Sequence, residues 1–139
     1  MRVGAKLFLA ENKKEGSALL YNPQAMLARH YRITDQKDFI EVKDQGELIQ
    51  SVSFGLSYLK RRDDEPSRFA FVISNKVSKQ SVVRNKVKRA LLEAVRQSLA
   101  YIKPGYNVIF LAKEISARKY TNELMHEVVL ALRTGRIMQ

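Results

Sequence analysis

One apolar repeat constrains the fold of this chain more than any other feature of its sequence. From position 83 onward every fourth residue is apolar, and small residues stand beside the repeat: Val83, Val87, Ala90, Leu91, Ala94 and Val95. This spacing predicts a helix that begins at Ser81 and carries one apolar stripe. The Pro104-Gly105 pair ends the helical pattern. The rest of the chain must therefore supply a surface on which this stripe packs.

The segments on either side of the helix predict that surface. Residues 69–74 and 107–112 are apolar runs of strand length that contain β-branched and aromatic residues. A strand, a helix and a second strand in this order favour two parallel neighbours in one sheet.

Three further elements complete the predicted fold. We expect Thr34 to cap a short helix that stops at Gly46. Residues 48–59 alternate apolar with small or polar side chains, which predicts a half-buried strand interrupted by Gly55. Thr121 is expected to cap a last amphipathic helix. The order of elements indicates an α+β fold, an α/β sandwich, with a central mixed sheet of about four strands.

The length of 139 residues fits one folded domain. The pattern of the folded body begins at Met26, so we expect a domain at residues 26–139. Residues 1–25 are expected to form an N-terminal arm or extension, either a short hairpin or a loose segment. No function follows from their sequence.

Charge is the most informative part of the composition. There are 25 Lys and Arg against 14 Asp and Glu, a net charge of +11, which indicates a polyanionic partner. No apolar run approaches the ~20 residues of a membrane helix, and the basic segment is only a weak match to the Lys-rich amphipathic helix with large apolar anchors that binds membrane surfaces. The absence of cysteine excludes disulfides, thiolate zinc sites and cysteine nucleophiles. We expect a soluble, cytoplasmic protein with no membrane partner and no small-molecule substrate.

The cations are concentrated in one segment. No acidic residue occurs between Glu65 and Glu93, and this interval holds seven cations: Arg68, Lys76, Lys79, Arg84, Lys86, Lys88 and Arg89. A solvated surface with no partner usually mixes both signs, so the run favours a phosphate-binding surface. At about 100° per residue, Arg84 and Lys88 flank one edge of the apolar stripe while Lys86 and Arg89 lie beyond the other. We therefore expect exposed cations on both flanks of the helix.

Within this run the order of residues is specific. Lys76-Val77-Ser78-Lys79 followed by Arg84-Asn85-Lys86-Val87-Lys88-Arg89 resembles the signature of the bacterial ribonuclease P protein, whose usual core reads Arg-Asn-Arg, one residue, then Lys-Arg. Residues 32–39 resemble the first helix of that family, residues 69–74 its central strand and residues 106–113 its last strand. The resemblance covers roughly residues 27–133.

The resemblance implies a fold and a function. The family fold is a small α/β sandwich with a left-handed strand-helix-strand crossover, although most such crossovers are right-handed. The catalytic groups belong to an RNA subunit and its Mg²⁺ ions, so the resemblance implies no catalytic residue and no metal ligand on this chain. The protein docks on that RNA and holds the single-stranded 5′ leader of precursor tRNA in a cleft between its first helix and the sheet.

The resemblance also assigns residues to these two surfaces. The implied RNA-docking set comprises Lys76, Lys79, Arg84, Asn85, Lys86, Lys88 and Arg89. Phe39 matches an aromatic residue of the leader cleft, Tyr58 is a candidate for the same cleft, and Phe71 is a weaker candidate because it also fits the core. Lys86 stands where the family usually has Arg, which keeps the charge but loses a bidentate fork. Lys43 replaces a frequent second aromatic residue of the leader helix.

Three other functions remain open at the level of sequence. A non-catalytic RNA-binding or ribosome-associated module would use the same basic helix. A protein-only nuclease would need clustered carboxylates for its metals, but the acids here are dispersed and Asp63-Asp64-Glu65 reads as a solvated turn. His30 and His126 have no partners at ligand spacing. A helix-turn-helix DNA reader is disfavoured because strands flank the basic helix.

Overall fold

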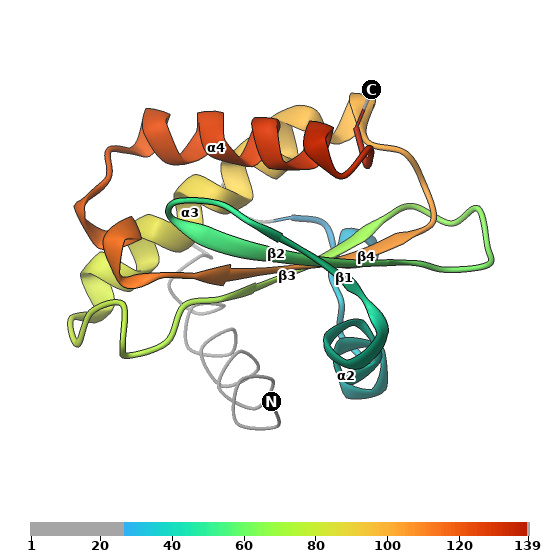
Figure 1. Cartoon of the computed structure of the whole chain (residues 1–139), viewed down its shortest axis with the longest axis horizontal. Coiled ribbons are helices and arrows are strands. Elements are labelled where there is room, and N and C mark those ends of the chain that lie inside the picture. The colour runs from blue at the N-terminus through green and yellow to red at the C-terminus, as the bar shows by residue number, and fades with distance from the viewer. Residues whose placement is uncertain (1–26, 139) are drawn as a thin grey trace.

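The computed structural model describes residues 27–138, which form one sheet with helices on both of its faces (Figure 1). The predicted arm at residues 1–25 and Met26 lie outside the described residues. Within this range no helix is both long enough and apolar enough to cross a membrane.

The sheet has four strands in the order β1-β2-β4-β3, and it is mixed as predicted. The strands are β1 (Glu47–Gln50), β2 (Phe54–Lys60), β3 (Arg68–Val72) and β4 (Tyr106–Ala112). β1 pairs antiparallel with β2, β2 antiparallel with β4, and β3 parallel with β4. The predicted strand-helix-strand unit is therefore confirmed. Its left-handed sense, which the resemblance implies, stays a prediction.

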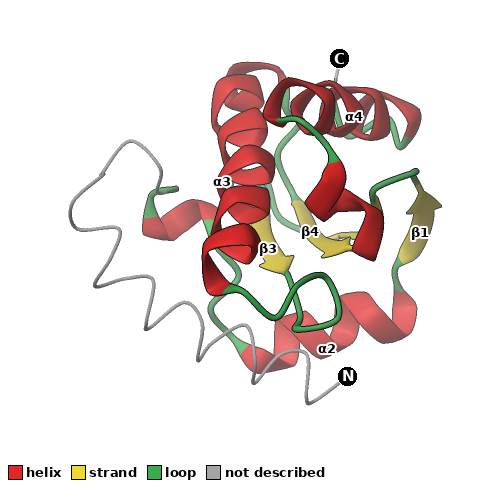
Figure 2. Ribbon diagram, turned by 90° about the vertical axis from the view of Figure 1, so that its left-hand side faces the viewer, coloured by secondary structure: helices red, strands yellow, loops and turns green. Residues whose placement is uncertain are grey.

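The helices lie on opposite sides of the sheet, which confirms the α+β sandwich. α2 (Gln36–Gln45) lies on one face, and α3 (Ser81–Ser98) and α4 (Thr121–Thr134) lie on the other (Figures 1 and 2). Short 3₁₀ turns connect these elements: η2 (Arg29–Tyr31), η3 (Leu99–Tyr101) and η4 (Glu114–Arg118).

The apolar stripe of α3 packs as its spacing predicts. Val87, Leu91 and Val95 are buried together with Ala90 and Ala94, and only Val83, near the start of the helix, is partly exposed. Beneath the helices the core contains Phe54, Phe71 and Phe110. Phe71 stacks on Phe110 with ring centroids 5.4 Å apart, and Phe54 meets the edge of the same ring at 5.4 Å. This aromatic cluster joins the three longest strands of the sheet.

Two predicted helix caps are each wrong by one residue: the predicted cap of α2 is one residue too early, and that of α4 is one residue too late. Asp35 rather than Thr34 caps α2, because its Oδ1 accepts a hydrogen bond of 2.9 Å from the Lys37 amide. Thr121 is the first helical residue of α4 rather than its cap, and Tyr120 precedes it. Gly46 ends α2 as expected, and glycine is needed there because a Cβ would lie 2.7 Å from the Tyr58 carbonyl oxygen.

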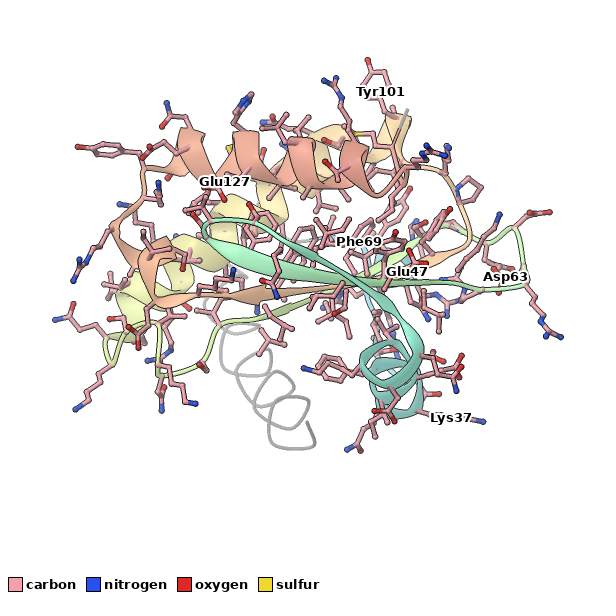
Figure 3. The ribbon with its side chains drawn as sticks, viewed as in Figure 1. Lys37, Glu47, Asp63, Phe69, Tyr101 and Glu127 are labelled. Carbon is pink, nitrogen blue, oxygen red and sulfur yellow. The ribbon has the colours of Figure 1, made fainter. Side chains whose placement is uncertain are left out.

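The prediction of one strand at residues 48–59 is wrong. The segment is a hairpin whose turn at residues 51–53 separates β1 from β2. Glu127 of α4 accepts hydrogen bonds from the Ser51 hydroxyl (2.7 Å), the Ser53 hydroxyl (2.7 Å) and the Ser53 amide (3.1 Å). Figure 3 shows Glu127 lying below α4 at this turn. A helix residue 74–76 positions away thus fixes the turn, and local alternation in the sequence carries no sign of it.

The environment of Glu127 changes its protonation equilibrium. Burial acts to raise the pKa of its carboxyl, but the hydrogen bonds from Ser53 and Ser51 act in the opposite direction and outweigh burial. The pKa of Glu127 is therefore lowered in the folded protein. The three donors stabilise the ionised form, so the carboxylate holds the turn best when it is charged.

We predict that Glu127→Gln lowers the free energy of unfolding by about 1–3 kcal/mol at neutral pH, because a charged acceptor of three hydrogen bonds is lost. A depressed folded-state pKa contributes stability that is complete above the pKa in the unfolded chain and is lost as the pH falls through the folded-state pKa. Denaturant unfolding of both proteins should therefore show a difference that shrinks on acidification. The exposed Glu41→Gln on α2 is the matched control. A difference that stays constant at acid pH would contradict this account.

Candidate nucleic-acid interface

The loop that leads from β3 into α3 is held in place by hydrogen bonds. Val77 is buried and its amide donates to the Ser74 carbonyl at 3.0 Å. The Arg84 guanidinium, one turn inside α3, donates to the carbonyls of Ser78 (2.9 Å) and Lys79 (3.1 Å). These contacts fix the loop backbone while the side chain of Lys79 stays exposed.

The exposed face of α3 carries part of the predicted docking set. Lys86 and Arg89 are exposed, Asn85 is partly exposed, and the three share the side of the helix opposite the buried stripe. Further along the same face Glu93 pairs with Arg96, whose Nε donates to the carboxylate at 2.9 Å. The exposed positive surface therefore belongs to the first half of the helix and to the loop before it, where Lys76 and Lys79 are exposed.

The expectation of exposed cations on both flanks of α3 is wrong for one flank. Lys88 is only 5% exposed and Arg84 is partly buried. The reason is that the buried arc is wider than the apolar stripe: Leu92, one turn after Lys88 on the same edge, is buried as well. The helix therefore presents its cations on the Lys86 and Arg89 side.

The three aromatic residues assigned to a leader cleft do not come together. Residues paired across neighbouring strands point to the same face of a sheet. Leu56 pairs with Phe110 and Phe110 with Phe71, and Tyr58 follows Leu56 by two residues, so all four share one face. A methyl group added at Gly135, just after α4, would meet Tyr58 Cε1 at 3.4 Å. This face is therefore the one that α3 and α4 cover.

Phe39 approaches the sheet from the other side. It belongs to α2, where its neighbour Asp38 forms an ion pair of 3.9 Å with Arg68 on the opposite face of β3. The sheet thus separates Phe39 from Phe71, and both rings are buried, at 4% and 3% exposure. The grouping of Phe39, Tyr58 and Phe71 in one cleft is wrong, because strand alternation alone does not reveal which face of the sheet each helix covers.

The partly buried Tyr58 is engaged by a neighbour on β1. Its hydroxyl donates to Glu47 Oε2 at 2.6 Å, a contact at the edge of the sheet. This hydrogen bond, with burial as a smaller cause, raises the pKa of Tyr58 to about 12. The side chain therefore links β2 to β1 at the end of the hairpin that lies away from its turn.

The acidic turn behaves as the sequence predicts. Residues 63–65 are exposed, and the Arg61 guanidinium binds Asp63 with its Nε and one terminal nitrogen. This hydrogen bonding, the largest cause, lowers the pKa of Asp63. Among residues 27–138 there is no group of three or more His, Asp or Glu side chains placed to hold a metal ion.

A groove of about 610 Å³ lies where the loop before α3 faces η4. Lys76, Val77 and Lys79 line it from the loop, and Glu114, Ile115 and Arg118 line it from η4. Sequence reasoning places only the loop side in a functional site, because η4 is 35 residues further along the chain and resembles no motif.

These features define a class of protein: a small, basic α+β sandwich that presents cations from one loop and one helix. The family model for ribonuclease P matches residues 27–134. The ribonuclease P protein component of Cyanothece sp. is 30% identical in an alignment of 128 residues that covers 81% of this chain and 98% of that protein. That of Rippkaea orientalis is 34% identical in an alignment of 100 residues that covers 69% of this chain and 75% of that protein.

Solved structures agree in fold. The Staphylococcus aureus RNase P protein superposes with a TM-score of 0.72 at 21% identity, covering 78% of this chain and 98% of that one. The Thermotoga maritima protein gives 0.64 at 24% identity, covering 73% and 96%. The chain belongs to the ribonuclease P protein family. It is the protein component of a tRNA-processing ribonuclease, and the enzymatic activity belongs to the ribonucleoprotein.

We predict that Arg84→Ala loosens the loop before α3, because two carbonyl groups lose their charged donor. At about 1.4 kcal/mol per tenfold change, the loss of such bonds should speed amide exchange of Val77 and Gln80 about tenfold or more. Arg84→Lys should not restore protection, since an ammonium lacks the planar fork. Hydrogen exchange read residue by residue measures this, with the exposed Lys86→Ala as control. Unchanged exchange in Arg84→Ala would show that the guanidinium does not hold the loop.

Proposed function

We propose that this chain binds the catalytic RNA subunit of ribonuclease P and the 5′ leader of precursor tRNA, and so supports endonucleolytic 5′ maturation of tRNA. The observation that carries the proposal is the exposed positive surface formed by the loop before α3 and the first half of that helix. Membership of the ribonuclease P family supports an RNA partner for this surface.

Docking on the RNA subunit is assigned to the exposed members of the motif. Lys76, Lys79, Lys86 and Arg89 are free to reach phosphates from the loop and the helix, and Asn85 lies between the two helix cations. Cations that neutralise phosphates release counterions, so such binding weakens as salt rises. Arg84 contributes by holding the loop, and Lys88, being buried, is left out of the contact set.

Leader binding is assigned to the face of the sheet that carries α2. Because the ring of Phe39 is buried, its role there is to seat α2 on the sheet rather than to stack on a base. Lys43, four residues further on and partly exposed, lies one turn along the same side of α2. Leader recognition in this chain then depends more on phosphate charge than on aromatic stacking.

The chemistry of cleavage is assigned to the RNA. Mg²⁺ would be held mainly by phosphates of the RNA subunit and of the substrate, and it would supply an activated water and charge stabilisation there. The chain itself binds and orients, and its place of action is the cytoplasm. The alternative, a ribosome-associated or other non-catalytic RNA-binding module, shares the positive surface but gives no stimulation of cleavage.

We predict that the chain stimulates cleavage of precursor tRNA by a bacterial ribonuclease P RNA at low Mg²⁺, because its cations relieve repulsion between two polyanions. Product formation with RNA alone, protein alone and both together measures this. Protein alone should release no product. Cleavage by protein alone would restore the nuclease hypothesis, and tight RNA binding without stimulation would favour the ribosome-associated module.

We predict that the double variant Lys86→Ala, Arg89→Ala lowers affinity for the RNA subunit and reduces the slope of log K against log salt by about 1.4–1.8, from about 0.7–0.9 per phosphate contact. The matched control is Arg96→Ala, which removes a cation from the same face that Glu93 already neutralises. Binding titrations across a salt series measure the slopes. A slope equal to that of the wild type would remove α3 from the interface.

A further inference from the structure

The groove between the loop before α3 and η4 has two independently fixed walls. On the loop side, Arg84 donates to the carbonyls of Ser78 and Lys79. On the η4 side, Ser116 is buried and its hydroxyl donates to the Lys113 carbonyl at 2.6 Å. The groove is therefore formed before any ligand arrives. Figure 2 looks at this end of the molecule, where the loop and the segment after β4 face the viewer.

Sheet topology explains why these two segments meet. β3 and β4 are parallel neighbours, and Val72 pairs with Leu111 at their carboxyl ends. The segments that follow them, the loop before α3 and η4, therefore leave the sheet at the same edge. Ligands of sheets with parallel strands commonly bind outside these carboxyl ends. The position of the groove follows from strand pairing rather than from a sequence motif.

The lining of the groove combines two kinds of surface. Val77, Ile115 and Ala117 supply apolar contact, and Ile115 is 43% exposed although it is a large aliphatic residue. Lys79 on one wall and Arg118 on the other are exposed cations. A flat aromatic base with a phosphate attached is the ligand whose chemistry matches apolar walls with cations at the rim. The volume of about 610 Å³ suits one such unit.

The presence of Glu114 favours a site for a single nucleotide over a surface that binds a continuous run of phosphates. Its carboxylate lines the same groove and would repel a continuous run of phosphates. A carboxylate accepts readily from the exocyclic amino group of a base, as in recognition of cytosine N4. The groove therefore suits a single nucleotide whose base carries an amino group.

We propose that this groove receives one unstacked nucleotide of the RNA partner, with its base against Ile115, its phosphate between Lys79 and Arg118, and its amino group donating to Glu114. The proposal rests on the function proposed above and adds η4 as a second RNA-binding wall. Single-stranded loops and bulges offer such splayed bases. A nucleotide held between two chain segments would also fix the register of the RNA on α3.

Two variants separate the contributions of base and phosphate. Arg118→Ala should lower affinity for the RNA subunit and reduce the salt slope by about 0.7–0.9, the value for one phosphate. Ile115→Ser should lower affinity about three- to tenfold with no change in slope, because a partly exposed aliphatic side chain contributes apolar contact alone. The matched controls on α4 are Arg133→Ala and Leu130→Ser, an exposed cation and an apolar residue that is 48% exposed.

A footprint identifies the nucleotide. In the wild-type complex a reagent that methylates unpaired bases should find one site in the RNA protected, and that site should become reactive with Ile115→Ser or Glu114→Gln while the rest of the footprint persists. Thermal melting confirms that each variant is folded. Wild-type affinity and slope for both groove variants, with stimulation of cleavage intact, would overturn the groove assignment alone. Absence of stimulation by the wild-type chain would instead overturn the proposed function.

Discussion

The parallel pairing of β3 with β4 across α3 is the constraint on which the rest of the structure depends. It places α3 over the sheet, so the apolar stripe from Val87 to Val95 is buried and the opposite side of the helix faces outward. The same pairing brings the carboxyl ends of two strands together at one edge of the sheet. The basic loop, the cationic half of α3 and the groove against η4 all lie at that edge because of this single connection.

Burial then divides the cations of the motif into two groups. A side chain on α3 faces solvent or core according to its angle about the helix axis, whatever its charge. Lys86 and Arg89 fall outside the buried arc, while Lys88 falls inside it, beside Leu92. Arg84 lies between these groups, and its guanidinium serves the loop backbone. The cations of the motif lie close together in the sequence but differ in the structure: some are exposed, one is buried and one holds the loop backbone.

Much of the fold could be predicted because local patterns and tertiary structure agree there. The α3 repeat and the two strands around it need only periodicity and strand length, and the structure confirms them. The hairpin at residues 51–53 could not be predicted, because the carboxylate that fixes it comes from α4. The acid-free run predicts where the exposed cations of the loop and α3 lie, but it does not reveal that Lys88 is buried. The sides of the sheet on which Phe39 and Tyr58 lie could not be predicted. Alternation shows which residues of a strand share a face, but it does not show which face a given helix covers.

The role of η4 could not be predicted from the sequence, because η4 is far along the chain from the loop that it faces. Charge density along the chain finds a surface only when its residues are contiguous, as in the acid-free run. Arg118 and Lys79 are 39 positions apart, and an acidic residue lies beside Arg118 on the same wall. Only strand pairing brings them to one groove. A continuous positive run suits the uniform phosphate backbone, whereas a groove of mixed character, assembled from distant segments, can distinguish one nucleotide from its neighbours. General affinity for RNA and the choice of register on it would therefore reside in different parts of the same edge.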